Sequence, residues 1–146
     1  MAGINLGLNG QLYLQAGGTG GYTSGAIVNN CQDLTLKVEK AKAKVTTRGN
    51  NGWEAYVPTL RDVTLSFKMI YDVGDANVVL VITSFLANSA PTNTLEGAVL
   101  DKDGFGLEAT FIVSSITRNE PLEEAMTLDI EMAIGYDPTH PPTWTT

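Results

Sequence analysis

Cysteine and histidine are almost absent from the sequence. Each occurs once among the 146 residues, as Cys31 and His140. A single thiol cannot form a disulfide within the chain, and it is compatible with synthesis in the cytoplasm. Cys31 has no histidine near it in the sequence, so we interpret it as an idle thiol rather than a nucleophile. With no cluster of His or Cys, the sequence predicts no metal site and no cofactor.

Positive charge is also scarce. Nine Lys and Arg residues stand against sixteen Asp and Glu residues, which gives a net charge of −7 and a pI of about 4.5. This balance argues against a protein that grips nucleic acid through its phosphates, although DNA could still pass without being held. No apolar run is long enough to cross a membrane. The first residues lack the basic and apolar regions of a secretory signal.

The motifs of common catalytic sites are missing as well. The glycine-rich residues 17–25 lack the lysine of a P-loop and the spacing of a dinucleotide-binding loop. Residues 101–111 have the composition of a calcium loop, but Val99 and Thr110 stand where the first ligand and the bidentate Glu would be. Glu123 and Glu124 are adjacent and would point to opposite faces of a strand. We therefore expect a protein that is not an enzyme and has no catalytic residues.

Several long segments alternate apolar and polar residues with a period of two, as expected for strands with one buried face. The clearest are residues 61–72, 107–119 and 124–137, with a shorter candidate at 94–100 and a turn at 101–106. The apolar side is expected to contain Val63, Leu65, Phe67, Met69 and Tyr71, then Leu107, Ala109, Phe111 and Val113, then Met126, Leu128, Ile130, Met132 and Ile134. In residues 33–45 the apolar residues occupy even-numbered positions up to Val38 and odd-numbered positions from Ala41. This change indicates a bulge in one strand or a break between two strands.

One stretch follows the period of a helix instead. Residues of about 75–88 place Val78, Val81, Ile82, Phe85 and Leu86 on one helical face. Asp75 can cap the start of this helix. The high content of β-branched residues leaves a strand as the alternative.

These patterns predict a mainly β fold, either a β-sandwich or a small barrel of long antiparallel strands, with one flanking α-helix and extended arms at both ends. We expect a single domain over residues 1–146. It divides into a Gly- and Asn-rich arm at 1–30 with one short strand, a β core at 31–136 and a Pro-rich tail at 137–146.

The segment 45–67, "VTTRGNNGWEAYVPTLRDVTLSF", resembles the signature of the major tail proteins, or tail tube proteins, of long-tailed bacteriophages. In that family a lysine-rich strand leads into a Thr-Arg-Gly loop, a Gly-Trp pair, then a Thr-Leu pair and a long strand. The matching residues are Thr47, Arg48, Gly49, Gly52, Trp53, Thr59 and Leu60. The strong match covers residues 34–72, and the order of elements agrees over most of the chain.

The resemblance implies a structural subunit of the virion tail, synthesised in the cytoplasm of the bacterial host. Six copies would form a ring, their strands would join into an inner β-barrel, and stacked rings would make a tube that conducts DNA during ejection. Its partners would be further copies of itself and other tail proteins such as the tape measure, terminator and baseplate proteins. DNA would pass without specific binding, and neither a cofactor nor a membrane is involved.

Two groups of site residues follow from the resemblance and the strand pattern. The loop expected to contact other subunits or to stack rings consists of Thr47, Arg48, Gly49, Asn50, Asn51, Gly52 and Trp53. The face expected to line the channel consists of Thr64, Ser66, Lys68, Thr127, Asp129 and Glu131, for which ordinary solvated strand faces remain the alternative. An acidic lining would repel phosphate and let DNA slide.

Two other functions stay open at this point. The tube protein of a contractile or secretion-type injection machine has the same ring-forming architecture. A β-sandwich module that binds carbohydrate would use Trp53 and Trp144 as stacking platforms.

Overall fold

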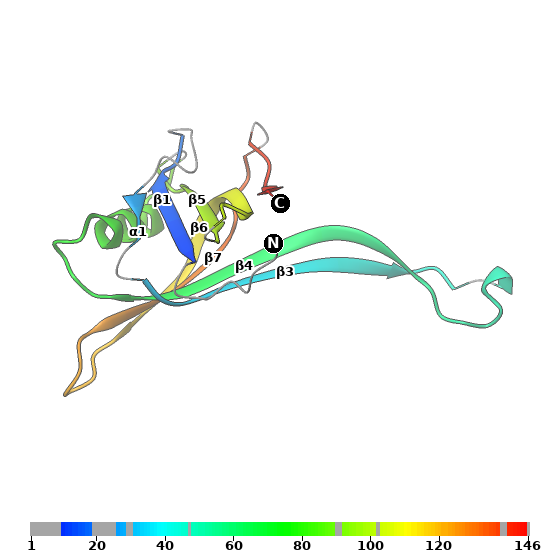
Figure 1. Ribbon diagram of the computed structural model, residues 1–146, viewed down its shortest axis with the longest axis horizontal. Helices are drawn as coiled ribbons and strands as arrows, with labels where there is room; N and C mark the ends of the chain where they lie inside the picture. The colour runs from blue at the N-terminus through cyan, green and yellow to red at the C-terminus, as the bar shows by residue number, and fades with distance from the viewer. Residues whose placement is uncertain are drawn as a thin grey trace.

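The chain forms an antiparallel β-sheet with one α-helix beside it and a long two-stranded arm that projects from the body (Figure 1). The computed structural model describes residues 10–18, 26–28, 31–46, 48–89, 92–101, 103–137 and 140–145. The strands within these residues are β1 (Gln11–Ala16), β2 (Ala26–Ile27), β3 (Cys31–Lys44), β4 (Tyr56–Ile70), β5 (Leu95–Leu100), β6 (Gly106–Asn119), β7 (Thr127–Ile134) and β8 (Thr143–Thr145). Their spatial order is β2-β1-β5-β6-β7-β4-β3, and β8 pairs with β6.

β6 joins the two halves of the sheet. Its first part, up to Phe111, pairs with β5, and its second part, from Phe111 to Asn119, pairs with β7. Phe111 is opposite Leu95 on one side and Ile134 on the other. The mainly β architecture predicted from the alternation is therefore confirmed, and a single continuous sheet builds it.

The sides of the strands predicted to be apolar do form the core. Leu65, Phe67 and Met69 of β4 pack in one buried cluster with residues of β7, β6, β1 and the helix. Each such side chain contributes about 1.5–3 kcal/mol by leaving water. β4 begins five residues earlier than the alternation predicts, because its first residues pair with β3 while both of their faces stay exposed. β7 is shorter than predicted, since pairing stops at Ile134.

The predicted helix is present as α1 (Ala76–Leu86). Asp75 is its N-cap, and the Asp75 carboxylate accepts a hydrogen bond from the Asn77 N–H at 2.8 Å. Val78 and Val81 are buried, as the helical spacing predicts. The prediction is wrong for Phe85 and Leu86, which are exposed because the last turn of the helix extends past the surface that the helix covers. In the same turn Ser84 is buried.

A bulge is present near residue 40, but it is not the cause of the break in the alternation of β3, because the extra residue lies on the partner strand. The pairing shifts between Lys40, opposite Arg61, and Lys42, opposite Pro58. One residue of β3 lies between these pairs and two residues of β4, so the extra residue belongs to β4. β3 itself runs on without a break, and its three lysines from residue 40 to 44 continue the side of Leu36 and Val38.

The two ends of the chain contribute strands to the sheet. β1 pairs along its whole length with β5, and Leu12 and Leu14 are buried in the core. β8 lies in the segment predicted as a tail and pairs with the start of β6, with Trp144 opposite Leu107. Most of residues 1–30 lie outside the described part of the chain.

The turn between β5 and β6 is a hairpin, as predicted for residues 101–106. The Asp101 carboxylate accepts hydrogen bonds from the N–H groups of Asp103 and Phe105, so the turn itself uses this carboxylate. Gly106 has φ +155°, and a Cβ there would lie 1.9 Å from the Val99 carbonyl oxygen. Only glycine fits where the two backbones approach so closely.

Candidate functional site

The six residues predicted to line a channel lie together on the solvent side of the sheet. The register places Ser66 opposite Glu131 and Lys68 opposite Asp129. Thr64 and Thr127 continue the same face at its two ends, opposite Ala133 and Ile70. The other side of β4 and β7 forms the core, so this polar face is the outward surface of a two-faced sheet.

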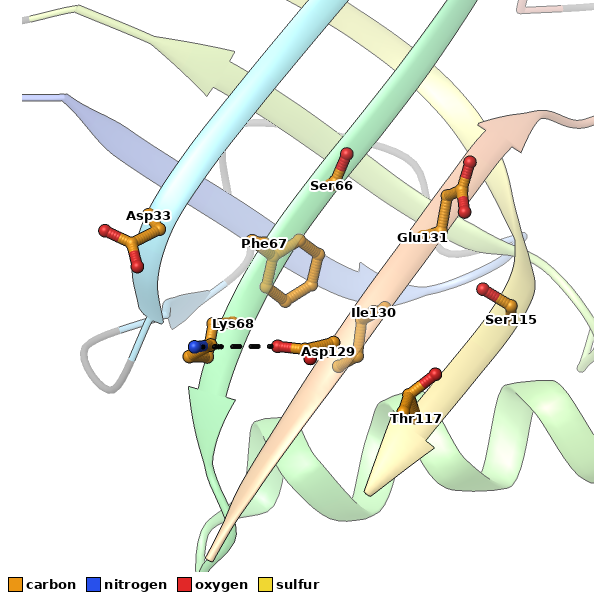
Figure 2. A pocket seen from close by; sticks show the side chains of 9 residues that line it. All are labelled: Asp33, Ser66, Phe67, Lys68, Ser115, Thr117, Asp129, Ile130 and Glu131. Carbon is orange, nitrogen blue, oxygen red and sulfur yellow. Dashed lines mark ion pairs between the residues drawn. The ribbon is translucent and has the colours of Figure 1, made fainter. Parts of the chain in front are cut away.

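A shallow hollow of about 270 Å³ lies on this face (Figure 2). Asp129 is at its centre: its carboxylate accepts a 2.7 Å hydrogen bond from the Asn119 amide and lies 4.0 Å from the Lys68 ammonium. Both Lys68 and Asp129 are partly exposed, so their attraction is weak and mainly orients the side chains. The hollow holds short hydroxyl and charged groups, with no nucleophile and base in contact.

Sequence reasoning missed the contribution of β6 to this face. Ser115 and Thr117 lie opposite Glu131 and Asp129, and Asn119 lies opposite Thr127. The register shifts between Val113 and Ser115, so the polar side of β6 changes from even to odd positions at this bulge. The period-two spacing of Ser115, Thr117 and Asn119 was the available signal, but only the pairing with β7 assigns it to this face.

The charges of the polar face have an acidic balance. Across β3, β4 and β7 it carries five acidic and two basic side chains, a net charge of −3: Asp33, Glu39, Asp62, Asp129 and Glu131 against Lys37 and Lys68. Lys37 pairs with Glu39 at 2.8 Å, and both are largely exposed. A polyanion would therefore meet weak repulsion along this surface.

The predicted contact loop lies at the end of a long arm, which we define as residues 37–61 of the β3–β4 hairpin (Figure 1). Arg48–Asn50 form one 3₁₀ turn, and Asn51 and Gly52 follow with φ of 52° and 78°. Thr47 lies outside the described residues. The loop closes where the Val45 N–H donates to the Ala55 carbonyl at 2.9 Å.

The arm has no core of its own. Among its residues with described side chains, all except Ala55 are exposed, including Trp53 at 76% and Leu60 at 81%. An isolated two-stranded hairpin is marginally stable in water, and so much exposed apolar surface is typical of a contact surface. Residues 56–62 alone carry the arm about 23 Å from the core.

Cations gather on the face of the arm that continues the core side of the sheet. Lys40 lies opposite Arg61, and Lys42 lies over the Tyr56 ring at 4.3 Å. Lys44 donates a 2.8 Å hydrogen bond to Glu54. The Lys44 ammonium, with a smaller contribution from the Tyr56 hydroxyl, holds the pKa of Glu54 below its ordinary value.

Two strand edges are open at opposite sides of the segment β6-β7-β4-β3. Within the described residues no strand pairs with the outer edge of β3. β5 leaves β6 at Phe111, so no described strand covers that side of β6 from Ile112 to Asn119. Each open edge presents a row of backbone N–H and C=O groups that can pair with another chain.

The described residues give no support to the alternative sites. The Cys31 thiol has its pKa raised to about 11 by burial and by Asp33, so it stays protonated at neutral pH. Trp53 is in the arm loop and Trp144 is on β8, so they form no shared stacking platform. In the described part of the chain no three His, Cys, Asp or Glu residues come close enough to hold a metal ion, and no helix could span a membrane.

No protein-family model matches the chain, and no curated protein matches it. Solved structures do match over nearly its whole length. A chain of the native gene transfer agent (GTA) virion has a TM-score of 0.76 and 14% identity, over 98% of this chain and 100% of that chain. A chain from the tail of an empty GTA particle, refined with C6 symmetry, has a TM-score of 0.78 and 16% identity over the same shares.

A chain of the SPP1 tail tube matches with a TM-score of 0.69 and 11% identity, over 97% of this chain and 80% of that chain. At these identities the likeness concerns the fold. The chain thus has the fold that is found in chains of the GTA tail and of the SPP1 tail tube.

Proposed function

We propose that the protein is the tube subunit of a virion tail, and that copies of it form hexameric rings that stack into a hollow tube. The observation that carries this proposal is the pair of open edges on the four-stranded segment β6-β7-β4-β3. Similarity in fold to chains of the GTA tail, which has C6 symmetry, and of the SPP1 tail tube supports it.

The direction of the strands allows the two edges to meet. Neighbouring strands in the segment are antiparallel, so β6 and β3 run in opposite directions. When β3 of one copy pairs with β6 of the next, the antiparallel order continues and the polar face stays on one side. Such a head-to-tail contact closes into a ring if the rotation fits, and ring closure removes both of these open edges.

The polar face would then line the channel. Its residues are short or charged, and its balance of five acidic against two basic side chains repeats in every copy. DNA would be repelled weakly and would slide through during ejection. The role is structural rather than catalytic. The tape measure, terminator and baseplate proteins would be partners in the virion tail, after synthesis in the host cytoplasm.

Self-assembly is the direct test of this proposal. Negative-stain microscopy of the purified protein at increasing concentration should show six-fold rings or tubes, because both open edges and the exposed arm would find partners. Size-exclusion chromatography with light scattering should show a matching shift from monomer to assembly. A protein that stays monomeric at every concentration, also with other tail proteins present, would overturn the proposal.

Charge reversal on the polar face tests the lining. The changes Asp129→Lys and Glu131→Lys add +4 per subunit on this face and should slow DNA ejection at least about tenfold, because a cationic lining binds phosphate. Tubes should still assemble, since both residues point away from the core. Ejection is measured by DNA release from reconstituted particles.

Two controls accompany this measurement. The neutral pair Asp129→Asn and Glu131→Gln should eject DNA at nearly the native rate. Asp103→Lys, in the turn between β5 and β6, adds positive charge away from the face and should have little effect. Native ejection by the reversed variant would place these residues outside the channel.

A further inference from the structure

Charge is unevenly distributed along the molecule. The arm contains six of the nine basic residues but only two of the sixteen acidic ones, so it carries +4 within a chain of −7. The rest of the chain, with three basic and fourteen acidic residues, carries −11. Two identical copies therefore attract each other most strongly when the arm of one meets the body of the other.

Only Lys44 of the basic face of the arm has an acidic partner among the described residues of the arm, Glu54 at 2.8 Å. We define this face as Lys40, Lys42, Lys44 and Arg61. Lys40 and Arg61 are directly opposite each other across the two strands, and neither forms an ion pair within the described residues. Like charges in directly opposed positions destabilise a strand pair. An anion placed against Lys40 and Arg61 would remove this repulsion.

The acidic counterpart is the turn between β6 and β7. This acidic tip consists of Glu120, Leu122, Glu123 and Glu124. Glu120 pairs with Arg118 at 3.3 Å, whereas Glu123 and Glu124 are exposed and form no ion pair with the described residues. Leu122 is 99% exposed and matches the exposed apolar residues of the arm, such as Leu60.

The strand directions place the arm and the acidic tip at opposite ends of the sheet. β3 runs toward the arm loop and β4 returns from it, whereas the antiparallel β6 runs away from that end and turns at the acidic tip. Figure 1 shows both hairpins leaving the body in opposite directions along the strands. Copies aligned along the strand direction would thus bring the arm of one copy toward the acidic tip of the next.

We propose that the basic face of the arm docks on the acidic tip of a second copy of this chain in the adjacent ring, so that stacking depends on charge. This inference rests on the proposed tube function. The contact is heterologous and does not close on itself, so it repeats from ring to ring and elongates the tube. Six such contacts between two rings add up, although each exposed ion pair is weak alone.

Paired charge reversal tests this docking. Lys40→Glu with Arg61→Glu, and separately Glu123→Lys with Glu124→Lys, should each raise the concentration needed for tubes at least about tenfold. Rings should still form, because the open edges of β3 and β6 are unchanged. A chain that carries all four changes should form tubes again within about threefold of the native concentration. Light scattering and microscopy follow assembly, and circular dichroism confirms folding.

The same experiment separates the possible failures. If the native protein forms neither rings nor tubes, the tube function itself fails. If native tubes form but the four changes together restore nothing, only the docking fails. The matched control is Asp103→Lys with Glu108→Lys, which reverses two charges away from the acidic tip. If these two changes restored tubes to the chain with Lys40→Glu and Arg61→Glu, the arm would dock on a surface other than the acidic tip.

Chemical cross-linking of native tubes gives a second test of the docking and needs no substitutions. A carbodiimide joins an amine and a carboxylate only when they touch, so in native tubes it should link Lys40 or Lys42 of one copy to Glu123 or Glu124 of another. Mass spectrometry of digested tubes identifies the linked peptides. Tubes in which the arm lysines link only to other carboxylates would overturn the proposed acceptor.

Discussion

Deletion of residues 48–52 from the arm loop should leave the subunit folded and abolish the stacking of rings. The deletion removes the 3₁₀ turn and the two residues with positive φ, and it leaves a four-residue loop between Val45 and Ala55. Hairpin loops of four residues are common, so the β3–β4 ladder can close. None of the deleted residues with a described side chain belongs to the core, and the free energy of unfolding should change by less than about 1 kcal/mol.

Thermal and denaturant unfolding measure the stability of the deletion variant, and microscopy measures its stacking. A second variant replaces the same five residues with Gly and Ser, which keeps the length of the loop and removes its chemistry. If length alone matters, this variant forms tubes; if Arg48 and its neighbours make the contact, it forms rings only. Loss of folding in both variants would show that the loop supports the subunit itself.

Phe111→Ala should remove about 3–5 kcal/mol of the free energy of unfolding, a large share of the 5–15 kcal/mol typical of a domain. Phe111 is fully buried and lies where β6 pairs with both β5 and β7. Its ring lies over Gly97, where an added Cβ would meet it at 3.1 Å. The substitution leaves a cavity at the junction of the sheet, which the surrounding strands can fill only in part.

Urea unfolding of the monomer at low concentration measures this loss without a contribution from assembly. The matched control is Ile112→Ala, one residue along the same strand, because Ile112 is exposed and faces away from the core. We expect a cost of about 1 kcal/mol or less there. A loss of similar size in both variants would contradict the assignment of Phe111 to the centre of the core.

The core side of the long strands could be predicted from sequence because the pleat of a strand is local. Successive side chains point to opposite faces, so the alternation around Leu65 and Phe67 fixes the buried side of β4 without knowledge of its neighbours. The helix was predictable for the same reason, from its period and from the cap at Asp75. The exposure of Phe85 and Leu86 could not be predicted from the sequence, because it depends on how far the surface that the helix covers extends along the helix.

The candidate site was predicted in part. The six residues predicted from β4 and β7 do share one face, but the residues from β6 were missed because a bulge at Ser114 reverses their side. The bulge or break inferred within residues 33–45 near residue 40 was wrong for a related reason. The bulge near residue 40 lies on β4, so β3 stays regular from Thr35 to Lys44 and its lysines continue the core side. A bulge is visible only when the partner strand is known.

The sequence alone determined that β4, β6 and β7 are strands, which side of β4 and β7 is buried and where the helix starts, because these depend on residues within a few positions of one another. Only the tertiary structure decided that β1 lies beside β5, that β6 joins the two halves and that a basic arm and an acidic tip lie at opposite ends of the sheet. These arrangements depend on pairing between residues far apart in the chain, and the burial of the whole core selects that pairing.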